Sequence, residues 1–544
     1  MFIEQIDIVG FRGVSQLSLK FNTEASVLIG ENRWGRSSLI SALMLLSLDN
    51  KFYEFVDSDF YHDKDKPNDN NISIKVTYCQ SYANEFNNQA YQALLPVTYQ
   101  SKEDQLRRIT YQITAKQQNS TIVTQHLLVD QNNNPFTIEN HKLLIAIVLN
   151  LNPVMALKNT LSTDDLPITN QPLSEYFINE LSNQLKQHSA SISEEELQRG
   201  LKAARALLEY YFIDPAQRYR YKHLPQKTSP HREDWNSLER INNALDNIND
   251  DYLRTALLGI FDSIVYAKGD NPLSPSSMPI LILEEPESQL HPIILSVGFR
   301  LLKHLPTQKI ITSNSSDLVS LFPLESIYRL IRLPGQIVTK YVAPHSLSAD
   351  DSRRILFHVL YRRPLALFAR CWLLVEGETE VWLLRELAEQ SGYHLGSEGV
   401  QLLEFAQCGL KPLIKYANKM GIHWYVITDG DMAGKKYADT VKSLTPQNED
   451  SNDYLTILPA KDIENFLFKH GFSHVYKQAA YNTIEHIDMP VSKIIQKAIH
   501  KSSKPDLAIA VCDDAKSRGI DAIPSLLTHT FAKIIQSSKD FIQR

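Results

Sequence analysis

The chain has 544 residues, of which 43% are hydrophobic and 22% charged, as in an ordinary soluble globular protein. This composition excludes a collagen-like repeat and a wholly disordered chain, and the length predicts about three or four domains. The net charge of −6 argues against a protein that simply coats nucleic acid, but it permits a basic face beside an acidic metal site.

No segment predicts a membrane span or an export signal. The longest apolar run, Leu143–Leu149, is far shorter than the roughly 20 residues of a membrane helix. The N-terminus carries an acid where a signal peptide has lysine and then an apolar stretch. The cysteines form no CxxC pair, which excludes a local zinc knuckle and a disulfide framework: Cys79, Cys371, Cys408 and Cys512. We therefore expect a cytoplasmic protein with no membrane partner.

The first 48 residues alternate strand and turn before they become helical. Phe2–Val9 and Gln16–Phe21 alternate apolar and polar residues around two glycines, which predicts a β-hairpin. Ser26–Ile29 predicts a short strand, and Ser37–Leu48 predicts an apolar helix.

The pattern then changes twice. From 71 to 130 it is strand-like and polar, with loops expected at 63–71 and 131–135. From 152 to 249 it becomes helical, and the apolar positions of Glu194–Phe212 recur at helical period.

Strands return at Pro279–Leu283 and Lys309–Thr312. In the last third, three strands alternate with helical stretches: Trp372–Val375, Trp424–Thr428 and Tyr454–Leu458. This alternation predicts βα units and a mostly parallel sheet.

A glycine-rich turn joins the third strand to the first helix. Gly30-Glu-Asn-Arg-Trp-Gly35-Arg36-Ser37 has the spacing G-x-x-x-x-G-K-[ST], with Arg36 in place of the lysine. In such a loop backbone N–H groups surround phosphate oxygens, the helix N-terminus adds positive potential, and the hydroxyl of Ser37 can hold Mg²⁺. Taken alone, the loop is equally typical of a glycine turn before a core helix.

An acidic strand favours the phosphate loop. Ile280-Leu-Ile-Leu-Glu284-Glu285 is apolar and ends in two carboxylates; in P-loop ATPases one such acid faces Mg²⁺ and the next faces the attacking water. The start of the chain, the glycine loop and Glu284-Glu-Pro-Glu-Ser-Gln-Leu-His291-Pro together resemble the ABC-type ATPases of the SMC, RecF and OLD groups. Those enzymes split this fold around a long insertion, as the stretch between the two motifs would require.

Three departures from that pattern predict weak or absent ATP hydrolysis. The planar fork of Arg36 cannot sit as a point charge between phosphates. Asn314 stands where the related ATPases carry a histidine, and no clear LSGGE signature precedes the acidic strand. The resemblance therefore implies ATP binding with slow or no turnover. The nucleotide-binding residues that we expect are Gly30, Asn32, Gly35, Arg36, Ser37, Ser38, Glu284, Glu285 and Asn314.

Three strand ends in the last third of the chain deliver carboxylates. The first ends in Glu-Gly-Glu-Thr-Glu, the second in Asp-Gly-Asp, and the third leads into Asp-Ile-Glu. Residues two apart in extended chain project to one side, so both aspartates of the second motif can face one cation. Any one of these acids alone would more often be a helix cap or a solvated loop residue. Together they predict an oxygen-ligand site for Mg²⁺ or Mn²⁺: Glu376, Glu380, Asp429, Asp431, Asp462 and Glu464.

The first two of these motifs resemble the Toprim domain of topoisomerases, primases, RecR and the OLD nucleases. The resemblance implies that Glu376 is a metal ligand or general acid/base, that Asp429 and Asp431 bind metal, and that Glu380 belongs to the site while Glu378 lies outside it. An ABC-type ATPase followed by a Toprim domain resembles the OLD family, in its stand-alone class related to the Gabija nuclease.

The OLD resemblance also implies a further acidic patch and a late lysine beside the metals. Asp462 and Glu464 fit the patch, and Lys504 is our candidate for the lysine, with Lys501 as the alternative. The implied reaction is two-metal phosphodiester hydrolysis: one cation activates water, the other stabilises the leaving oxygen, and the lysine neutralises developing charge. The catalytic residues expected are Glu376, Glu380, Asp429, Asp431 and Lys504.

A basic cluster precedes the first Toprim strand: Arg353, Arg354, Arg362, Arg363 and Arg370. It could hold DNA phosphates near the metals, and Arg362 and Arg363 are the residues that we assign to DNA. The competing interpretation is a charged helical face or a seam between domains.

We therefore predict an α/β chain with an ABC/SMC-like ATPase domain at 1–150 and 251–345, a helical insert at 151–250 that forms a homodimer, and a Toprim nuclease domain at 346–544. The expected function is metal-dependent DNA cleavage regulated by the degenerate ATPase, in DNA repair or anti-phage defence. A helicase or other defence partner is not identified by the sequence. Two alternatives stay open: a RecF-like DNA-structure sensor with a vestigial nuclease site, and a regulatory ATPase whose Toprim domain only docks a partner.

Overall fold

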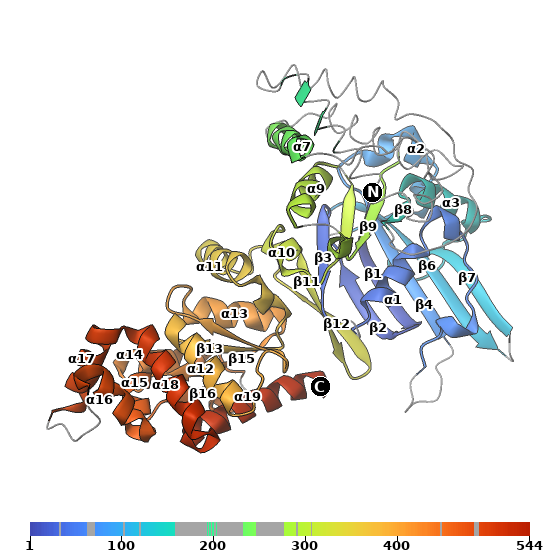
Figure 1. The fold of residues 1–544 in the computed structure, drawn as a ribbon. Coiled ribbons are helices and arrows are strands. Elements are labelled where there is room, and N and C mark those ends of the chain that lie inside the picture. Colours follow the sequence, from blue (N-terminus) through green and yellow to red (C-terminus); the bar gives the residue numbers. More distant parts are fainter. Residues whose placement is uncertain are drawn as a thin grey trace, which may run out of the picture. The chain divides into compact units, whose positions relative to one another are not determined.

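The chain folds into two units, each with its own sheet (Figure 1). The first comprises Met1–Phe322 and Ser326–Thr339, and the second Pro323–Glu325 and Lys340–Arg544. Besides a few residues between 193 and 203, the computed structural model describes residues 1–31, 34–62, 71–101, 104–118, 121–157, 232–245, 277–289, 292–305, 307–446, 449–482 and 489–543.

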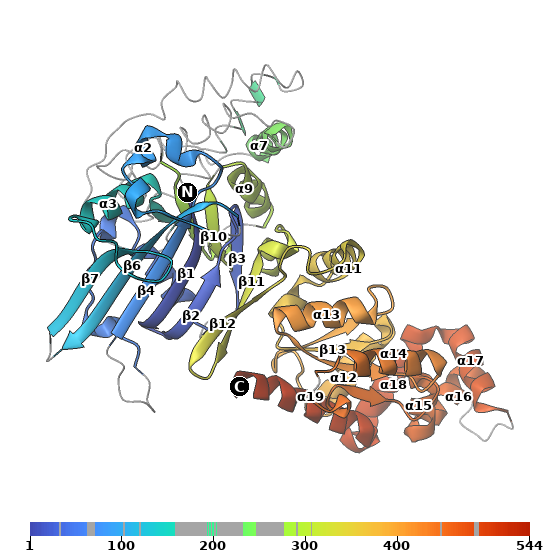
Figure 2. The same ribbon diagram turned by 180° about the vertical axis from the view of Figure 1, so that it is seen from behind.

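The first unit is built on one large sheet, with 12 strands in the described residues. Its first half is antiparallel: β1 pairs with β2 and β4, β6 pairs with β4, and β5 and β7 both pair with β6 (Figure 2). These strands are β1 (Phe2–Phe11), β2 (Val14–Lys20), β4 (Asn71–Cys79), β5 (Tyr99–Gln100), β6 (Arg107–Gln118) and β7 (Thr121–Val129).

Strand β1 shows how the sequence fixes the faces of this sheet. Ile6 and Ile8 are fully buried, as the alternation of apolar and polar residues predicts. Ile3 is also fully buried although it lies three residues before Ile6, because the register with β4 shifts between Ile3 and Gln5. A bulge of this kind adds one residue and returns the following side chains to the core face.

The other half of the sheet is parallel, with neighbours β11, β3, β10, β9 and β8 in that order. Residues 280–283 of β9 are at most 1% exposed, which explains the continuous apolar run of a strand buried on both faces. The remaining strands are β3 (Ala25–Ile29), β8 (Val154–Leu157), β9 (Ile280–Glu284), β10 (Gln308–Thr312), β11 (Ile327–Leu333) and β12 (Gln336–Tyr341).

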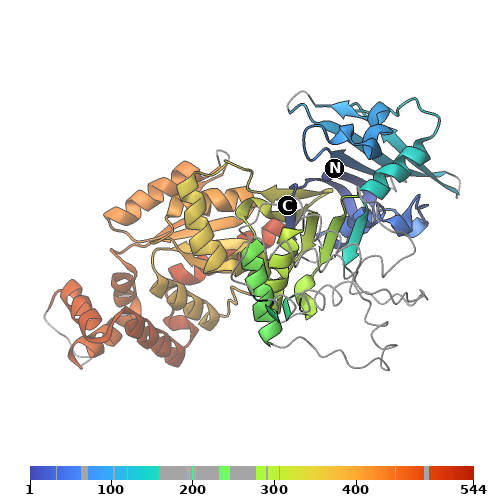
Figure 3. The same cartoon turned by 90° about the horizontal axis from the view of Figure 1, so that it is seen from above.

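Helices of the first unit pack on its sheet and on one another. Helix α1 contacts β1 and β8, α3 contacts β7, and α7 lies against α9, green beside yellow-green in Figure 3. Their bounds are α1 (Arg36–Met44), α2 (Gln89–Gln92), α3 (His141–Leu151), α7 (Arg232–Leu245), α9 (Pro292–His304) and α10 (Ser316–Val319).

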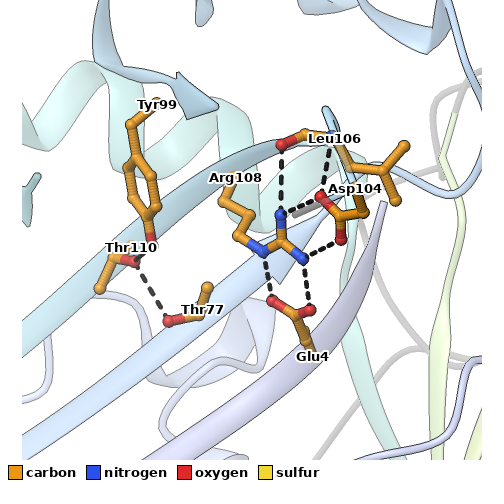
Figure 4. Close-up of polar contacts among 7 residues, drawn as sticks. All are labelled: Glu4, Thr77, Tyr99, Asp104, Leu106, Arg108 and Thr110. Carbon is orange, nitrogen blue, oxygen red and sulfur yellow. Dashed lines mark hydrogen bonds and ion pairs between the residues drawn. The ribbon is translucent and has the colours of Figure 1, made fainter. Parts of the chain in front are cut away.

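One arginine ties three segments of the antiparallel half together. Arg108 on β6 reaches across β4 to β1 and donates two hydrogen bonds to Glu4, at 2.6 and 2.7 Å (Figure 4). It also donates to the carboxylate of Asp104, and these bonds lower the pKa of Asp104 to about 2. Beside it, Thr110 bonds both Thr77 on β4 and Tyr99 on β5, so polar pairs lock the register of four strands.

The second unit has a four-stranded parallel sheet in the order β14-β13-β15-β16. One face contacts α12 and α19, and α13 and α14 also contact strands of the sheet. The bounds are β13 (Cys371–Val375), β14 (Val400–Glu404), β15 (His423–Thr428), β16 (Leu455–Ile457), α11 (Ala349–Ile355), a π-helical turn (Leu356–Tyr361), α12 (Glu378–Gln390), α13 (Leu410–Met420), α14 (Met432–Leu444), α15 (Ile463–Leu467), α16 (Ser473–Tyr481), α17 (Val491–Ser502), α18 (Lys504–Arg518) and α19 (Ser525–Gln543).

The predicted fold class, mixed α/β with a parallel sheet in the C-terminal third, is confirmed. The strands that sequence reasoning missed are β8, β11, β12 and β14. Two local predictions are wrong. The helical pattern assigned from 152 onward contains strand β8, and a helix, α3, comes just before it; Val154–Leu157 pairs with β9 and so completes the sheet. Asn71 is not loop but the first residue of β4.

Parts of the prediction lie outside the described residues. These are the loop at 63–70 and most of the helical insert at 151–250, including nearly all of Glu194–Phe212. The cysteines are all free and buried. Among the described helices, none is both long enough and apolar enough to span a bilayer.

The buried face of β13 generates a stability prediction. Trp372 is fully buried, stacks on Tyr416 with ring centroids 6.1 Å apart, and donates its indole N–H to the carbonyl of Ala366 at 2.8 Å. Trp372→Ala should lower the free energy of unfolding by about 3–5 kcal/mol, through the cavity and the lost hydrogen bond. Urea unfolding followed by circular dichroism measures this.

Trp382 supplies the matched control, because it lies on α12 and is 40% exposed. Trp382→Ala should cost about 1 kcal/mol or less. Equal losses in the two variants would contradict the assignment of Trp372 to the core.

Candidate functional site

The candidate metal centre lies at the carboxyl edge of the second unit's sheet. All four strands are parallel, so their carboxyl ends meet at this edge. The chain leaves β13 for β14 on one side and returns to β15 on the other, and open parallel sheets bind ligands where their connections diverge in this way. Glu376 directly follows β13 and Asp429 directly follows β15, so the two carboxylates flank the point of divergence.

Glu376 and Glu380 are joined by a local hydrogen bond. Glu380 lies in the first turn of α12, and its Oε2 accepts from the backbone N–H of Glu376 at 3.0 Å. The N-cap of α12 is Gly377, which has no side chain to cap the helix, so a carboxylate from the first turn bonds the strand end instead. Both residues are half-buried, whereas Glu378 is exposed to solvent.

The Asp429-Gly430-Asp431 turn is held by backbone packing. Asp431 is the N-cap of α14 and accepts from the N–H of Gly434 at 2.7 Å. A Cβ on Gly434 would lie 1.9 Å from the carbonyl oxygen of Asp429, and one on Gly430 would lie 2.4 Å from that of Ala460. Only glycine fits at either position, so both glycines fix where the two aspartates point.

Sequence reasoning missed the role of Gly434. The available signal was a glycine in the first turn of a helix, where it costs roughly 1 kcal/mol relative to alanine and so marks a close approach of the backbone.

The third acidic motif brings a lysine to the site. Asp462 is the N-cap of α15 and accepts from the N–H of Asn465 at 2.7 Å. Glu464 is only 8% exposed, and its Oε1 lies 2.8 Å from Nζ of Lys504, the first residue of α18. Lys504 forms this ion pair, whereas Lys501 forms no ion pair with any described residue. The geometry therefore favours Lys504 as the lysine beside the acids.

The electrostatics of this edge show a shortage of positive charge. Burial, together with the charges of Glu380, Glu376, Asp462 and Glu464, raises the pKa of Asp429 to about 8. Burial and the neighbouring Glu376 likewise raise the pKa of Glu380 to about 7, and burial and Asp431 raise that of Glu376. Lys504 is the positive charge at this edge. Burial lowers its pKa, but the negative charges of Glu464, Asp462 and Glu380 outweigh burial, so the pKa of Lys504 is raised.

The donor set suits a hard cation, although the carboxylates do not form a closed site. All the donors are carboxylate oxygens, which is the chemistry that Mg²⁺ and Mn²⁺ prefer. Within the described part of the chain, no three acidic, histidine or cysteine side chains converge tightly enough to hold a metal ion as they stand. The reason is local: Glu380, Asp431 and Asp462 accept backbone N–H groups, and Glu464 binds Lys504.

The predicted phosphate loop lies between β3 and α1. Gly35 is the N-cap of α1 with φ +86°, and a Cβ there would lie 2.4 Å from Ile337, so glycine is required. Ser37 is exposed at the start of the helix, whereas Oγ of Ser38 accepts from the N–H of Gly13 at 3.2 Å. Gly30 begins the loop directly after β3, and Asn32 lies outside the described residues.

Arg36, in the lysine position of this loop, is bound to the ends of the neighbouring strands. The side chain is 5% exposed and donates to the carbonyl of Ser313 at 3.1 Å and to Oδ1 of Asn314 at 2.7 Å. Asn314 donates in turn to Glu285 at 2.6 Å, and Glu285 lies 3.7 Å from the guanidinium. The guanidinium of Arg36 therefore already lies beside the acidic end of β9, whose last residue is Glu284.

The predicted DNA-binding arginines are engaged within the second unit. Arg363 forms an ion pair with Glu404 and donates to the carbonyl of Leu402 at 3.3 Å. Arg362 donates to Gln407 at 3.1 Å and lies over the ring of Phe357 at 5.0 Å. These contacts within the unit favour the competing interpretation of the cluster as a charged helical face.

The raised pKa of Asp429 predicts how the metal-free protein responds to pH. The folded state binds this proton more tightly than the unfolded state, so its stabilising effect is present at low pH and is lost as pH rises through about 8. Asp429→Asn mimics the protonated carboxyl. The melting temperature of this variant should therefore exceed that of the wild type at pH 8–9, by about 2–4 °C for each kcal/mol of destabilisation that the ionised carboxylate causes. The difference should shrink towards pH 5, where both side chains are neutral.

Thermal melts in a chelator test this, with Asp439→Asn as the control because that carboxylate on α14 is 77% exposed. Added Mg²⁺ should then stabilise the wild type more than Asp429→Asn. A variant that is less stable than the wild type at every pH would contradict the charge repulsion.

Comparisons with known proteins match both units. Residues 1–366 match the family described as "Protein of unknown function (DUF2813)", and residues 367–431 match "Overcoming lysogenization defect protein-like, TOPRIM domain". An Escherichia coli K12 protein described as "Uncharacterized protein YbjD" is 39% identical over 547 residues, which cover 98% of this chain and 99% of that protein.

Solved structures give weaker likenesses. The C-terminal region of the Burkholderia pseudomallei OLD protein is 19% identical with a TM-score of 0.27, covering 32% of this chain and 99% of that one. The SMC head domain from Thermotoga maritima is 11% identical with a TM-score of 0.30, covering 63% of this chain and 99% of that one. TM-scores this low carry no weight for the function of this chain.

The resemblance to the OLD family that the sequence predicts is confirmed by the Toprim match, whose residues include both the Glu376 and the Asp429 motifs. The match over residues 1–366 and the relative along nearly the whole chain settle the family. The chain belongs to the DUF2813 family and carries an OLD-like Toprim domain in its second unit.

Proposed function

We propose that the second unit is a nuclease that hydrolyses phosphodiester bonds of DNA with the help of Mg²⁺ or Mn²⁺. The observation that carries this proposal is the gathering of partly buried carboxylates at one edge of the parallel sheet, where Asp429 and Glu380 have raised pKa values and Lys504 supplies a positive charge. Negative charge that is only partly neutralised, at the sheet edge where the connections of neighbouring strands diverge, suits a site for cations.

The residues that would hold the metal are the acids of the three strand ends: Glu376, Glu380, Asp429, Asp431, Asp462 and Glu464. When bound, two cations would supply the activated water and the charge that stabilises the leaving oxygen. The protein's own contribution is positional. The Gly430–Gly434 packing fixes Asp429 and Asp431, and Glu464 orients Lys504 so that its ammonium group can face a phosphate oxygen.

The first unit would regulate this activity. Its phosphate loop and acidic strand are consistent with ATP binding in an ABC-type domain, but Arg36 already binds Asn314 and Ser313 and lies near Glu285. An arginine held in this way is not available as a mobile point charge for the phosphates, which accounts for the slow or absent ATP hydrolysis that we expect.

We place this activity in the cytoplasm, in DNA repair or anti-phage defence, and in a homodimer formed by the insert at 151–250. The buried, free cysteines are consistent with a reducing compartment. The second candidate function is a DNA-structure sensor whose nuclease site is vestigial. It is favoured by one observation, which is that three of the acids serve as hydrogen-bond acceptors for nearby backbone N–H groups.

A cleavage assay separates the two. Supercoiled plasmid and linear duplex would be incubated with Mg²⁺ or Mn²⁺, with and without ATP. We expect metal-dependent cutting that Asp429→Ala reduces by about 100-fold or more, because loss of a metal carboxylate removes several kcal/mol of charge stabilisation.

Glu378→Ala is the matched control, since this glutamate belongs to the same motif but is exposed, and it should cut like the wild type. DNA that is bound but not cut under any of these conditions would favour the sensor. A loss that is equal in Glu378→Ala and Asp429→Ala would refute the assignment of the site.

The Arg36 network yields a separate prediction. Arg36→Lys cannot make both buried bonds, so Ser313 or Asn314 loses its donor, at a cost of about 1–3 kcal/mol. The melting temperature should fall, whereas Arg353→Lys, at a side chain that is 78% exposed, should leave it nearly unchanged. ATP turnover should stay slow or absent in the wild type. Fast turnover by the wild type would show that the engaged arginine does not suppress hydrolysis.

A further inference from the structure

Two helices of the second unit are basic and contain no acid. Residues 465–482, which include α16, and 489–505, which include α17, hold no Asp or Glu in a chain whose net charge is −6. We call these two segments the basic hairpin. They carry six lysines and three histidines: Lys469, His470, His474, Lys477, Lys493, Lys497, His500, Lys501 and Lys504.

The lysines of α17 share its solvent face. Lys493, Lys497 and Lys501 are spaced four residues apart, about 6 Å along the axis, and all three are exposed. The opposite face, with Ile494, Ile495 and Ala498, is buried in the core of the unit. Packing therefore fixes which side of the helix presents positive charge.

Within the part of the chain that the structure describes, no acid neutralises two of these three lysines. Lys493 and Lys501 form no ion pair among the described residues, and Nζ of Lys497 lies 3.7 Å from the ring centroid of Tyr481. Two of the three acids of the neighbouring α18 are engaged elsewhere: Asp506 bonds Ser503, and Asp514 bonds His474 and Arg518; the third, Asp513, is exposed.

The basic hairpin adjoins the acidic site. Helices α16 and α17 pack on each other, and α17 also contacts α15, the helix that carries Glu464 (Figure 1). Just after α17 ends at Ser502, Lys504 reaches Glu464 at 2.8 Å. The helix that carries the row of lysines therefore packs in the same core as the helix that carries Glu464.

We propose that the solvent face of α17, with Lys493, Lys497 and Lys501, binds the phosphate backbone of the DNA that enters the Toprim site. This proposal rests on the proposed nuclease function and names the surface that would hold its substrate. A cleaved phosphate would lie at the acids, so its neighbours along the strand need positive charge beside them, and this hairpin supplies it.

The surface suits a polyanion better than a membrane. A helix that inserts into a bilayer needs an exposed apolar face, but the apolar residues of α17 face the core. Evenly spaced ammonium groups without shape or hydrogen-bond specificity are typical of backbone contacts, which position DNA without reading its sequence.

The test compares two triple variants of the full chain. Lys493→Ala, Lys497→Ala and Lys501→Ala remove the proposed contacts; Lys411→Ala, Lys442→Ala and Lys516→Ala remove the same charge from exposed lysines of α13, α14 and α18. Binding of a fluorescent duplex is measured by anisotropy in a chelator, where no metal-dependent cutting occurs, over a range of NaCl concentrations. A third variant changes the α17 lysines to arginine.

We expect the α17 variant to bind about tenfold or more weakly at low salt, and its slope of log affinity against log salt to fall by about 0.9 per lost contact, or about 2–3 in all. The control should match the wild type, and the arginine variant should retain binding, which separates charge from folding. Equal DNA binding by the α17 variant and the control would overturn the proposal. In a parallel assay with anionic lipid vesicles, an α17 variant that loses vesicle binding but keeps DNA binding would also overturn it.

Failure of the α17 surface and failure of the proposed nuclease function give different results. Wild-type protein that binds DNA through α17 but cuts nothing would refute the nuclease and keep the surface. Metal-dependent cutting that the α17 variant performs as well as the control would refute the surface and keep the nuclease. Wild-type protein that neither binds nor cuts would overturn both.

Discussion

Repulsion among carboxylates is the constraint on which the second unit depends. Its parallel sheet brings the carboxyl ends of the strands to one edge, and the sequence places acids at three of them. Burial raises the pKa of Asp429 and Glu380, and the charges of neighbouring carboxylates raise both further. The fold tolerates this because backbone N–H groups and Lys504 each offset part of the charge, and the remainder is what a bound cation would neutralise.

In the first unit the key charged group is a buried cation that is already paired. There the cation of the phosphate loop, Arg36, is buried and already bonded to the strand ends that carry Asn314 and Glu285. A planar guanidinium suits this because it donates in several directions at once, which an ammonium group on a flexible stem cannot do with the same geometry. One unit therefore has acids that lack a counter-charge, and the other has a cation whose counter-charges are in place. We expect the second unit, with its acids, to respond to metal, and the first unit, with Arg36, to respond weakly to nucleotide.

The sequence predicted the strands that carry these groups because each has a local signature. Apolar runs that end in acids identify β9, β13 and β15, and the glycine spacing identifies the loop before α1. The same local reasoning failed at Val154–Leu157, where four residues become a strand only by pairing with β9, more than a hundred residues away in the chain. It also could not see that Arg363, one of a basic cluster, pairs with Glu404 on β14.

By itself, therefore, the sequence determined which residues could do chemistry: the acids of the strand ends, the phosphate loop and the family to which the motifs belong. Those features follow from short-range patterns, since a strand, a turn and a cap are each specified within a few residues. Only the tertiary structure decided how each group is used. It bonded Arg36 to Asn314, paired Lys504 with Glu464, packed Gly434 against Asp429 and left the lysines of α17 exposed. Each of these depends on contacts between segments distant in the chain or on which face of a helix the core buries, and no local pattern encodes that.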